Sequence, residues 1–317
     1  MRVTQSMLSN NMLRNLNKSY YKMSKLQNQI DSGSKITRPS DNPVITVKGM
    51  GYRRDLNQVE QYTRNLGEVN TWLDTSNQSL DQVNSALVRV KELIVQAAND
   101  TNTEEDRKKI NSEISQIKLE LQDIANTQVG GKYIFSGTKT NSPLFVDGEI
   151  NTDLLDQTKP DPKPFLPAAS ADVNIEVFNG IQLTVNTNGT EVFKDINDFM
   201  TKVSDLLESG ATGTEISEAL GADITDSATS AKIPGLDTVS DKVLSSLADI
   251  GARQNRAEMM ENRLSMQEVN VTKQLSDNED VDYAKAITEM VTQESIHQAA
   301  LSVGAKIIQQ TLVDFIR

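Results

Sequence analysis

The acidic side chains near the end of the chain come closest to a group that could do chemistry. Asp277, Glu279, Asp280 and Asp282 could offer carboxylate oxygens to Ca²⁺, which prefers hard oxygen ligands. The segment lacks the glycine and the terminal glutamate of an EF-hand loop. Acidic residues at helix starts and in loops usually cap helices or keep a surface soluble. The sequence therefore predicts no metal site here.

Other catalytic and cofactor signatures are missing from the sequence. There is a single histidine, His297, so a catalytic triad or metal cage built on paired histidines is excluded. His297 falls on an apolar stripe, which favours a half-buried interface residue. The glycines at 130, 131 and 137 follow a predicted helix rather than a strand, which favours a turn over a phosphate-binding loop. We expect no enzyme activity and no cofactor.

Composition narrows the class of protein further. The 317 residues carry a net charge of −12, which argues against nucleic acid as a partner because such proteins need a basic face. Aromatic residues make up 4% and cysteine is absent, which favours narrow helix-on-helix seams and excludes disulfides. The sequence offers no apolar run of membrane-spanning length and no signal-peptide core. We expect a protein that is cytoplasmic or exported without a cleaved signal, and no membrane partner.

A long helical seam is the clearest structural signal. Apolar residues spaced alternately by three and four recur from Val59 to Ala97, with Ser76 as the polar exception. Such a heptad repeat predicts a coiled-coil-type helix. The helix is predicted from Pro43, capped by Asn42, to about Asn99. It would be about 85 Å long at ~1.5 Å per residue, longer than a compact domain of this size needs.

Two more helices are predicted to complete a bundle. One is capped by Thr103, carries Ile110, Ile114, Ile117, Leu121 and Ile124, and stops at Gly130. Its short connection to the first helix predicts antiparallel packing. The other begins after Gly235 and is less regular, because Arg253 and Gln267 occupy inward-looking positions.

The region between these helices differs in character. It is rich in proline, and two alternating apolar runs flank Asn179-Gly180. This pattern predicts a β-hairpin with a two-residue turn. A short amphipathic helix is expected to follow and to end near Gly210. We interpret this region as a small separate α+β domain inserted into the helical part.

Both chain ends carry apolar stripes at helical spacing. Such a stripe could dock on the core of a compact monomer, but these ends are long and lie outside the bundle. An isolated pair of such helices has little to bury and should be marginal. We therefore predict self-assembly, with Ile296, Ala300, Val303 and Ile307 forming a second face. The predicted assembly interface is Met12, Leu16, Met23, Leu26, Ile30, Ile287, Met290, Leu301, Ile308 and Phe315.

The segment SGSKITRPSDNP, residues 32–43, separates the first terminal helix from the bundle. Gly33 is expected to end one helix, Pro39 to keep the linker extended, and Asn42 with Pro43 to begin the next helix. We predict that this segment forms a defined bend.

Together these patterns predict a mainly α protein. Both ends of the chain form a long antiparallel helical bundle or coiled coil, and a small α+β domain containing a β-hairpin is inserted. The predicted divisions are residues 1–42 with 277–317, residues 43–140 with 235–276, and the inserted region 141–234.

The chain also resembles a known family. Its first 44 residues, up to PSDNPV, are similar to the start of bacterial flagellins and their relatives, and ADIGARQNRAE, residues 248–258, resembles the C-terminal helix of that superfamily. The prolines of PSDNP and the segment YIFSGTKT, residues 133–140, resemble its hook–filament junction branch. The resemblance covers about residues 1–140 and 235–317.

The resemblance implies a secreted structural subunit of the bacterial flagellum. Export would use the flagellar type III apparatus, so the protein would be cytoplasmic before export. Its terminal helices would pair as coiled coils in an inner tube, and the bundle would form an outer wall. The implied partners are further copies of the chain in a ring or helical assembly, a neighbouring hook-associated protein, flagellin and a secretion chaperone.

Three alternatives compete with this interpretation. The first is flagellin itself, against which the prolines and the small middle region argue. The second is a receptor or phage coiled-coil protein, and a receptor would require a membrane segment. The third is an enzyme with its active site in the inserted domain, which a conspicuous polar pocket there would favour.

Overall fold

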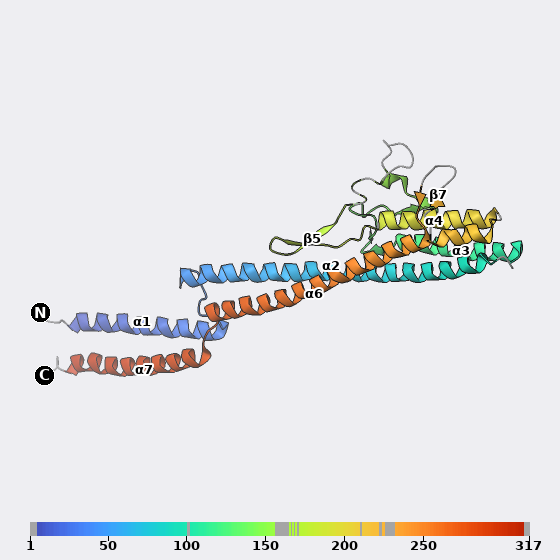
Figure 1. Cartoon of the computed structure of the whole chain (residues 1–317). Coiled ribbons are helices and arrows are strands. Elements are labelled where there is room, and N and C mark those ends of the chain that lie inside the picture. Colours follow the sequence, from blue (N-terminus) through green and yellow to red (C-terminus); the bar gives the residue numbers. More distant parts are fainter. Residues whose placement is uncertain are drawn as a thin grey trace. The chain divides into compact units, whose positions relative to one another are not determined.

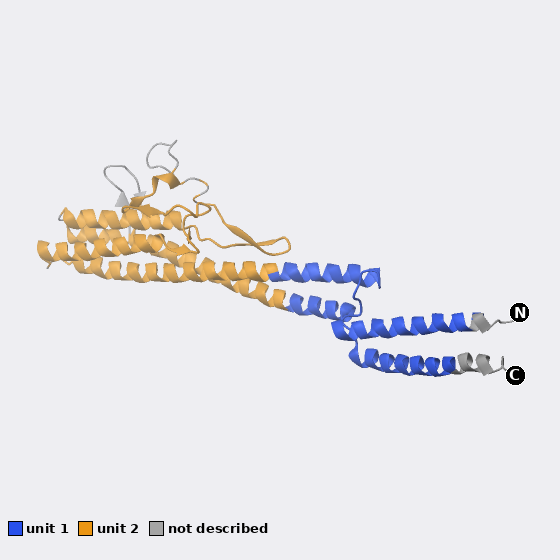
Figure 2. Ribbon diagram, turned by 180° about the vertical axis from the view of Figure 1, so that it is seen from behind, with its two compact units in different colours: residues 1–60, 266–317 blue, residues 61–265 orange. Residues whose placement is uncertain are grey.

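The computed structural model describes residues 5–99, 102–155, 165, 167, 169, 171–209, 211–221, 224–225 and 232–313. These residues form two compact units (Figure 2). Unit 1 consists of residues 1–60 and 266–317, and unit 2 consists of residues 61–265. Two long helices contribute to both units.

Most described residues lie in α-helices, and the strands are short (Figure 1). The helices are α1 Gln5–Ser32, α2 Pro43–Ala97, α3 Glu104–Ala125, α4 Gly189–Glu208, α5 Gly213–Gly221, α6 Leu236–Glu279 and α7 Tyr283–Val313. The predicted fold class is confirmed: long helices from both ends of the chain pack together, and small antiparallel sheets occupy the middle region.

The heptad seam of α2 supplies much of the core of unit 2. Its apolar members between Tyr62 and Ala97 are buried, and Ser76 is fully buried among them. Five apolar residues of α6 in unit 2 are also almost fully buried: Val239, Val243, Ile250, Ala257 and Leu264. The predicted seams of both helices are therefore buried in the structure.

Helix α3 begins and packs as its sequence predicts. The side chain of Thr103 accepts a hydrogen bond from the backbone N–H of Asp106 at 3.3 Å, which satisfies one of the free N–H groups of the first turn. Arg89 of α2 and Glu113 of α3 form an ion pair at 2.7 Å. Contacts between residues on the two sides of a short connection fit the predicted antiparallel pair.

The described residues between α3 and α6 form four two-stranded antiparallel sheets. The strands pair as β1 Gln128–Val129 with β2 Lys132–Tyr133, β3 Phe145–Val146 with β4 Glu149–Ile150, β5 Asn174–Phe178 with β6 Ile181–Thr184, and β7 Ile224–Thr225 with β8 Lys232–Ile233. The predicted hairpin is present as β5–β6. Gly180 has φ +72°, which glycine adopts at little cost.

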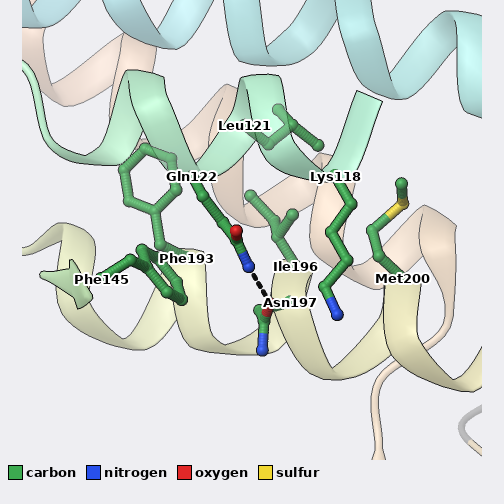
Figure 3. Close-up of a pocket in the computed structure, with 8 residues that line it drawn as sticks. All are labelled: Lys118, Leu121, Gln122, Phe145, Phe193, Ile196, Asn197 and Met200. Carbon is green, nitrogen blue, oxygen red and sulfur yellow. Dashed lines mark hydrogen bonds between the residues drawn. The ribbon is translucent and has the colours of Figure 1, made fainter. Parts of the chain in front are cut away.

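Helix α4 packs against α3, so the middle region shares its core with the bundle (Figure 3). Phe193, Ile196 and Phe199 of α4 are almost fully buried. Between the two helices, Gln122 donates hydrogen bonds to Asn197 Oδ1 at 2.8 Å and to the carbonyl of Gly148 at 2.9 Å. The predicted domain boundaries at 141 and 234 remain predictions, whereas both sides of these boundaries lie in unit 2.

The small pocket in this interface bears on the enzyme alternative. The apolar residues that line it are Leu121, Phe145, Phe193, Ile196 and Met200. Lys118 also lines the pocket and donates a hydrogen bond to Thr201 at 2.8 Å. Gln122 and Asn197, the other polar lining residues, bond to each other. No carboxylate or histidine lines this pocket, whereas Asp205 lines a larger groove between the same two helices.

Candidate assembly interface

Helices α1 and α7 of unit 1 pack side by side in opposite directions (Figure 1). Gln293 of α7 donates a hydrogen bond to the hydroxyl of Ser19 at 2.6 Å. Nearer the start of α1, the side chain of Met12 lies against Gly304. A Cβ atom added to Gly304 would come within 1.5 Å of the Met12 methyl carbon. The glycine therefore allows a close helix approach.

The predicted stripe on α1 is half-buried. Met12, Leu16, Met23, Leu26 and Ile30 all have intermediate exposure. Leu26 lines a groove together with Thr288 and Gln293 of α7. At least part of this stripe thus faces the partner helix of the same chain.

The predicted residues of α7 are less covered. Ile287 is 49% exposed and Leu301 is 47% exposed, whereas Met290 is half-buried. The side chain of Ile308 and all of Phe315 lie outside the described residues. The role of these residues in contacts between subunits stays a prediction.

Several exposed apolar residues were missed by the sequence prediction. On α1, Leu13 is 56%, Tyr20 62% and Tyr21 68% exposed. On α7, Val291 joins Ile296 and Val303 of the predicted second face, all more than half exposed. On α7 the spacing of Ile296 and Val303 had indicated a second apolar face. On α1, Leu13, Tyr20 and Tyr21 lie outside the one regular apolar stripe. They were missed because that stripe alone was predicted to contact other subunits.

The segment in which the bend is predicted contains a hydrogen-bonded turn and a helix cap. Arg38 to Asp41 form a turn in which the backbone N–H of Asp41 donates to the carbonyl of Arg38 at 2.9 Å. Pro39 occupies the second position, where its fixed φ is favoured. The side-chain oxygen of Asn42 accepts from the backbone N–H of Val44 at 3.2 Å, so Asn42 caps α2 and Pro43 is its first residue, as predicted.

The carboxylate of Asp41 closes this turn. Its partial desolvation favours the neutral acid, but hydrogen bonds from Arg38 and Thr37 and the charge of Lys25 outweigh that effect and lower the pKa of Asp41. The contribution of Asp41 to the turn is therefore present above its unfolded pKa and is lost as the pH falls through the folded pKa.

The connection between α1 and α2 contacts the connection between α6 and α7 inside unit 1. Gly33, with φ +69°, accepts a hydrogen bond at its carbonyl from the backbone N–H of Val281 at 2.9 Å. The backbone N–H of Lys35 donates to the carbonyl of Glu279 at 2.6 Å. A Cβ atom on Gly33 would lie 2.9 Å from the hydroxyl of Tyr283. Both the positive φ and the close Tyr283 hydroxyl therefore favour glycine at position 33. Its role in an interlayer bend stays a prediction.

The acidic cluster is used in structural contacts. Glu279 is buried, pairs with Arg53, and sits over Gly49, where an added Cβ would approach its carboxylate oxygen to 1.8 Å. Asp280 accepts a hydrogen bond from Ser276. Asp282 caps α7 by accepting from the backbone N–H of Lys285 at 3.1 Å. The described residues contain no group of three potential ligands that could hold a metal ion.

His297 lies on the α1–α7 contact, half-buried, with its ring 6.2 Å from that of Tyr20. This placement fits the interface residue that the sequence favours. No helix in the described part of the chain has a stretch both long and apolar enough to cross a membrane.

Most of the chain matches models of one protein family. The bacterial flagellin N-terminal helical region matches residues 3–140, and the bacterial flagellin C-terminal helical region matches residues 233–316. The chain belongs to the bacterial flagellin family. Members of this family are structural proteins, and the two matches leave the middle region outside.

Relatives of this flagellin-family chain align over most of its length. It is 25% identical over 319 residues to flagellar hook-associated protein 3 of Escherichia coli (strain K12), covering 94% of this chain and 93% of that protein. It is 28% identical over 302 residues to a flagellin of Halalkalibacterium halodurans, covering 95% of this chain and 92% of that one.

Solved structures show the same fold. A flagellar hook-associated protein from Vibrio parahaemolyticus aligns with a TM-score of 0.61 at 20% identity, covering 76% of this flagellin-family chain and all of that one. FlgL of Bacillus cereus aligns with a TM-score of 0.54 at 21% identity, covering 71% of this chain and 99% of that one.

Proposed function

We propose that this chain is the hook–filament junction subunit of the bacterial flagellum and that it seeds flagellin assembly. The observation that carries the proposal is the surface of the paired terminal helices α1 and α7. They contact each other yet leave large apolar side chains such as Leu13, Tyr21 and Val291 exposed. Neighbouring copies in a ring or helical assembly would cover these side chains.

The junction role is favoured over that of a filament subunit by two observations. The two structural neighbours described above bear hook-associated or FlgL names, whereas the alignments with hook-associated protein 3 and with flagellin both cover most of the chain and do not separate the two roles. Pro39, inside the turn before α2, and Pro43, the first residue of α2, resemble the junction branch. Flagellin remains the second candidate, because flagellins also match over most of the chain.

The proposed layers follow the predicted divisions. Residues 1–42 and 277–317 would form the inner coiled coil, residues 43–140 and 235–276 the outer helical wall, and residues 141–234 the variable region. Gly33, Pro39, Asn42 and Pro43 would fix the bend between layers. The proposed partners are a neighbouring hook-associated protein, flagellin, and a chaperone that binds before type III export to the extracellular flagellum.

A deletion strain tests the proposal directly. Electron microscopy of cells lacking the protein should show intact hooks without filaments, with flagellin lost to the medium. Filaments of normal number in the deletion strain would contradict the junction role. In the reverse experiment, purified chain added to filament seeds should not grow long filaments; growth would support the flagellin alternative.

Two variants returned to the deletion strain separate assembly from export. Leu13→Ser places a polar group on the exposed apolar surface and should abolish filament retention while secretion of the variant persists. Pro39→Ala combined with Pro43→Ala should weaken filament attachment and leave secretion intact. Gln182→Ala, an exposed residue of β6, is the matched control. Normal motility and filament retention in both variants would contradict the proposed interface and bend.

A further inference from the structure

The β5–β6 hairpin is fixed to α6 at its base. Asn186, fully buried, accepts a hydrogen bond at Oδ1 from the backbone N–H of Val173 at 2.7 Å and donates from Nδ2 to the carbonyl of Ala171 at 3.0 Å. These bonds tie the two ends of the hairpin together. The backbone carbonyl of Asn186 accepts a hydrogen bond from Arg253 at 2.6 Å. Arg253, one of the two polar residues that interrupt the α6 seam, thus has a partner at the base of the hairpin.

The tip of the hairpin is held by both long helices. The ring of Phe178 lies 6.1 Å from that of Tyr62 on α2, with 24° between the planes. The guanidinium carbon of Arg263 on α6 lies 4.2 Å from the centre of the Phe178 ring, a distance at which a cation is attracted to an aromatic face. Asn65 of α2 donates a hydrogen bond to the carbonyl of Glu176 at 2.7 Å.

A β-bulge places Phe178 where it can make these contacts. Strand pairing is regular from Asn174 to Glu176 and then shifts, so that Phe178 pairs with Ile181. In regular alternation, Phe178 would point away from the face on which Val177 is buried. One extra residue in a strand re-aims the side chains that follow it. Val177, fully buried, and Phe178 can therefore both face the helices.

The hairpin covers a segment that the shorter helices do not reach. The ion pair between Arg89 and Glu113 fixes the register of α2 and α3. Counting along this antiparallel pair, α3 ends at Ala125 beside about residue 77 of α2. The remaining part of α2 in unit 2, residues 61–76, carries Tyr62 and Asn65, both of which contact the hairpin.

We propose that the β5–β6 hairpin is a strap that closes the α2–α6 pair where α3 no longer covers it, with Phe178 as its releasable clasp. An isolated two-stranded hairpin is marginally stable in water, so the strap depends on its docking. The clasp consists of one ring and a few polar contacts, which places it among the low-stability elements that open locally. The proposal does not depend on the flagellar function.

Amide hydrogen exchange on the full chain tests the strap. Phe178→Ala should accelerate exchange about tenfold, the loss expected from one aromatic pair and one cation–π contact, in peptides covering residues 61–73, 257–265 and 174–184. Exchange in α3 and α4 should not change. Gln182→Ala, on the exposed face of the same hairpin, is the matched control and should exchange as the unaltered chain does. Equal exchange in the two variants would overturn the proposal.

A double-mutant cycle distinguishes local opening of the hairpin from general misfolding of the Phe178→Ala variant. Arg263→Gln changes an exposed side chain and should give a smaller acceleration in the same peptides. If Arg263 acts through the clasp, adding Arg263→Gln to Phe178→Ala should have almost no further effect. Additive acceleration in the double variant, or acceleration spread evenly over unit 2, would show that Phe178 supports the general core and would overturn the clasp.

Discussion

The two units of this chain differ in how far their apolar side chains are buried. Nearly all buried apolar residues of the described chain belong to unit 2; in unit 1 they are Val59, Val271 and Ala286. Most of the large exposed apolar residues belong to unit 1, including Leu13, Tyr21 and Ile296. Unit 2 thus buries its apolar surface within the chain, whereas unit 1 offers much of its own to solvent.

This difference has a simple physical origin. In unit 2 further elements cover the long helices. Helix α3 lies beside α2 and α4 packs on α3, while the β5–β6 hairpin contacts both α2 and α6. In unit 1, α1 packs with α7, and the start of α2 contacts the end of α6. A pair of helices can bury only the stripe of each helix that faces the other. Large exposed apolar surfaces commonly mark interaction sites. The comparison therefore predicts that substitutions of buried apolar residues in unit 2 affect folding and that substitutions of exposed apolar residues in unit 1 affect association.

The largest expected effect is in the core of unit 2. Phe193 packs edge-on against Phe135, with ring centres 4.8 Å apart, and both are almost fully buried. Phe193→Ala should lower the free energy of unfolding of unit 2 by about 3–5 kcal/mol, because it removes buried area and leaves a cavity. Urea denaturation followed by circular dichroism measures the loss. A change below about 1 kcal/mol would break the comparison, because surface substitutions cost that little.

A smaller effect is expected at the Glu279 contact of unit 1. Gly49→Ala should displace the Glu279 carboxylate and weaken its pairing with Arg53, at a cost of about 1–3 kcal/mol for a buried polar group left without its partner. Amide exchange of residues 43–60 and 266–279 measures the local opening. Gly51 on the same helix has no atom within 4 Å of an added Cβ, so Gly51→Ala is the control and should stabilise the helix by about 0.5–1 kcal/mol. Equal effects of the two substitutions would contradict the contact.

A pH-dependent effect is expected on α4. Desolvation raises the pKa of Asp198, against the opposing charge of Lys194. A carboxyl with a raised folded pKa takes up protons more readily in the folded state, so stability increases as the pH falls from the folded pKa toward the unfolded one. Asp198→Asn should therefore raise the melting temperature at pH 7 slightly, on the order of 1 °C, and remove this part of the pH dependence. A lower melting temperature of the variant at pH 7 would contradict the assigned cause.

The smallest effect on the monomer is expected at the exposed surface of α1. Leu13→Ser should change monomer stability by less than about 0.5 kcal/mol, as exposed substitutions usually do, while filament retention is lost. Thermal unfolding of the monomer and filament counts by electron microscopy give the two readings. If Leu13→Ser instead unfolds unit 1, the exposed surface belongs to the fold of the monomer and the contrast between the units is weaker than proposed.

Much of the fold could be predicted from periodicity alone. The heptad spacing from Tyr62 to Ala97 fixed which face of α2 is buried, because a three-four repeat allows one continuous apolar stripe. The Thr103 cap and the Asn179-Gly180 turn were equally local signals. Each depends on residues that are neighbours in the sequence, and each is present in the structure.

The candidate interface could be predicted only in part. The α1 stripe from Met12 to Ile30 was evident, but its spacing does not say whether another copy or α7 covers it. The structure places Met12 against Gly304 of the same chain, so that the more exposed Leu13 and Tyr21 present the uncovered surface. The partner of an amphipathic face depends on which helix lies beside it, and sequence spacing contains no such information.

The sequence by itself determined the helices, their caps, the hairpin and the apolar faces, because these follow from the chemistry of residues close together in the chain. Only the tertiary structure decided which faces meet. It paired Glu279 with Arg53 and Gly49, set Phe178 between Tyr62 and Arg263, and merged the inserted region with the bundle through α3 and α4. Such contacts join residues far apart in the sequence, and their geometry is set by packing rather than by local preference.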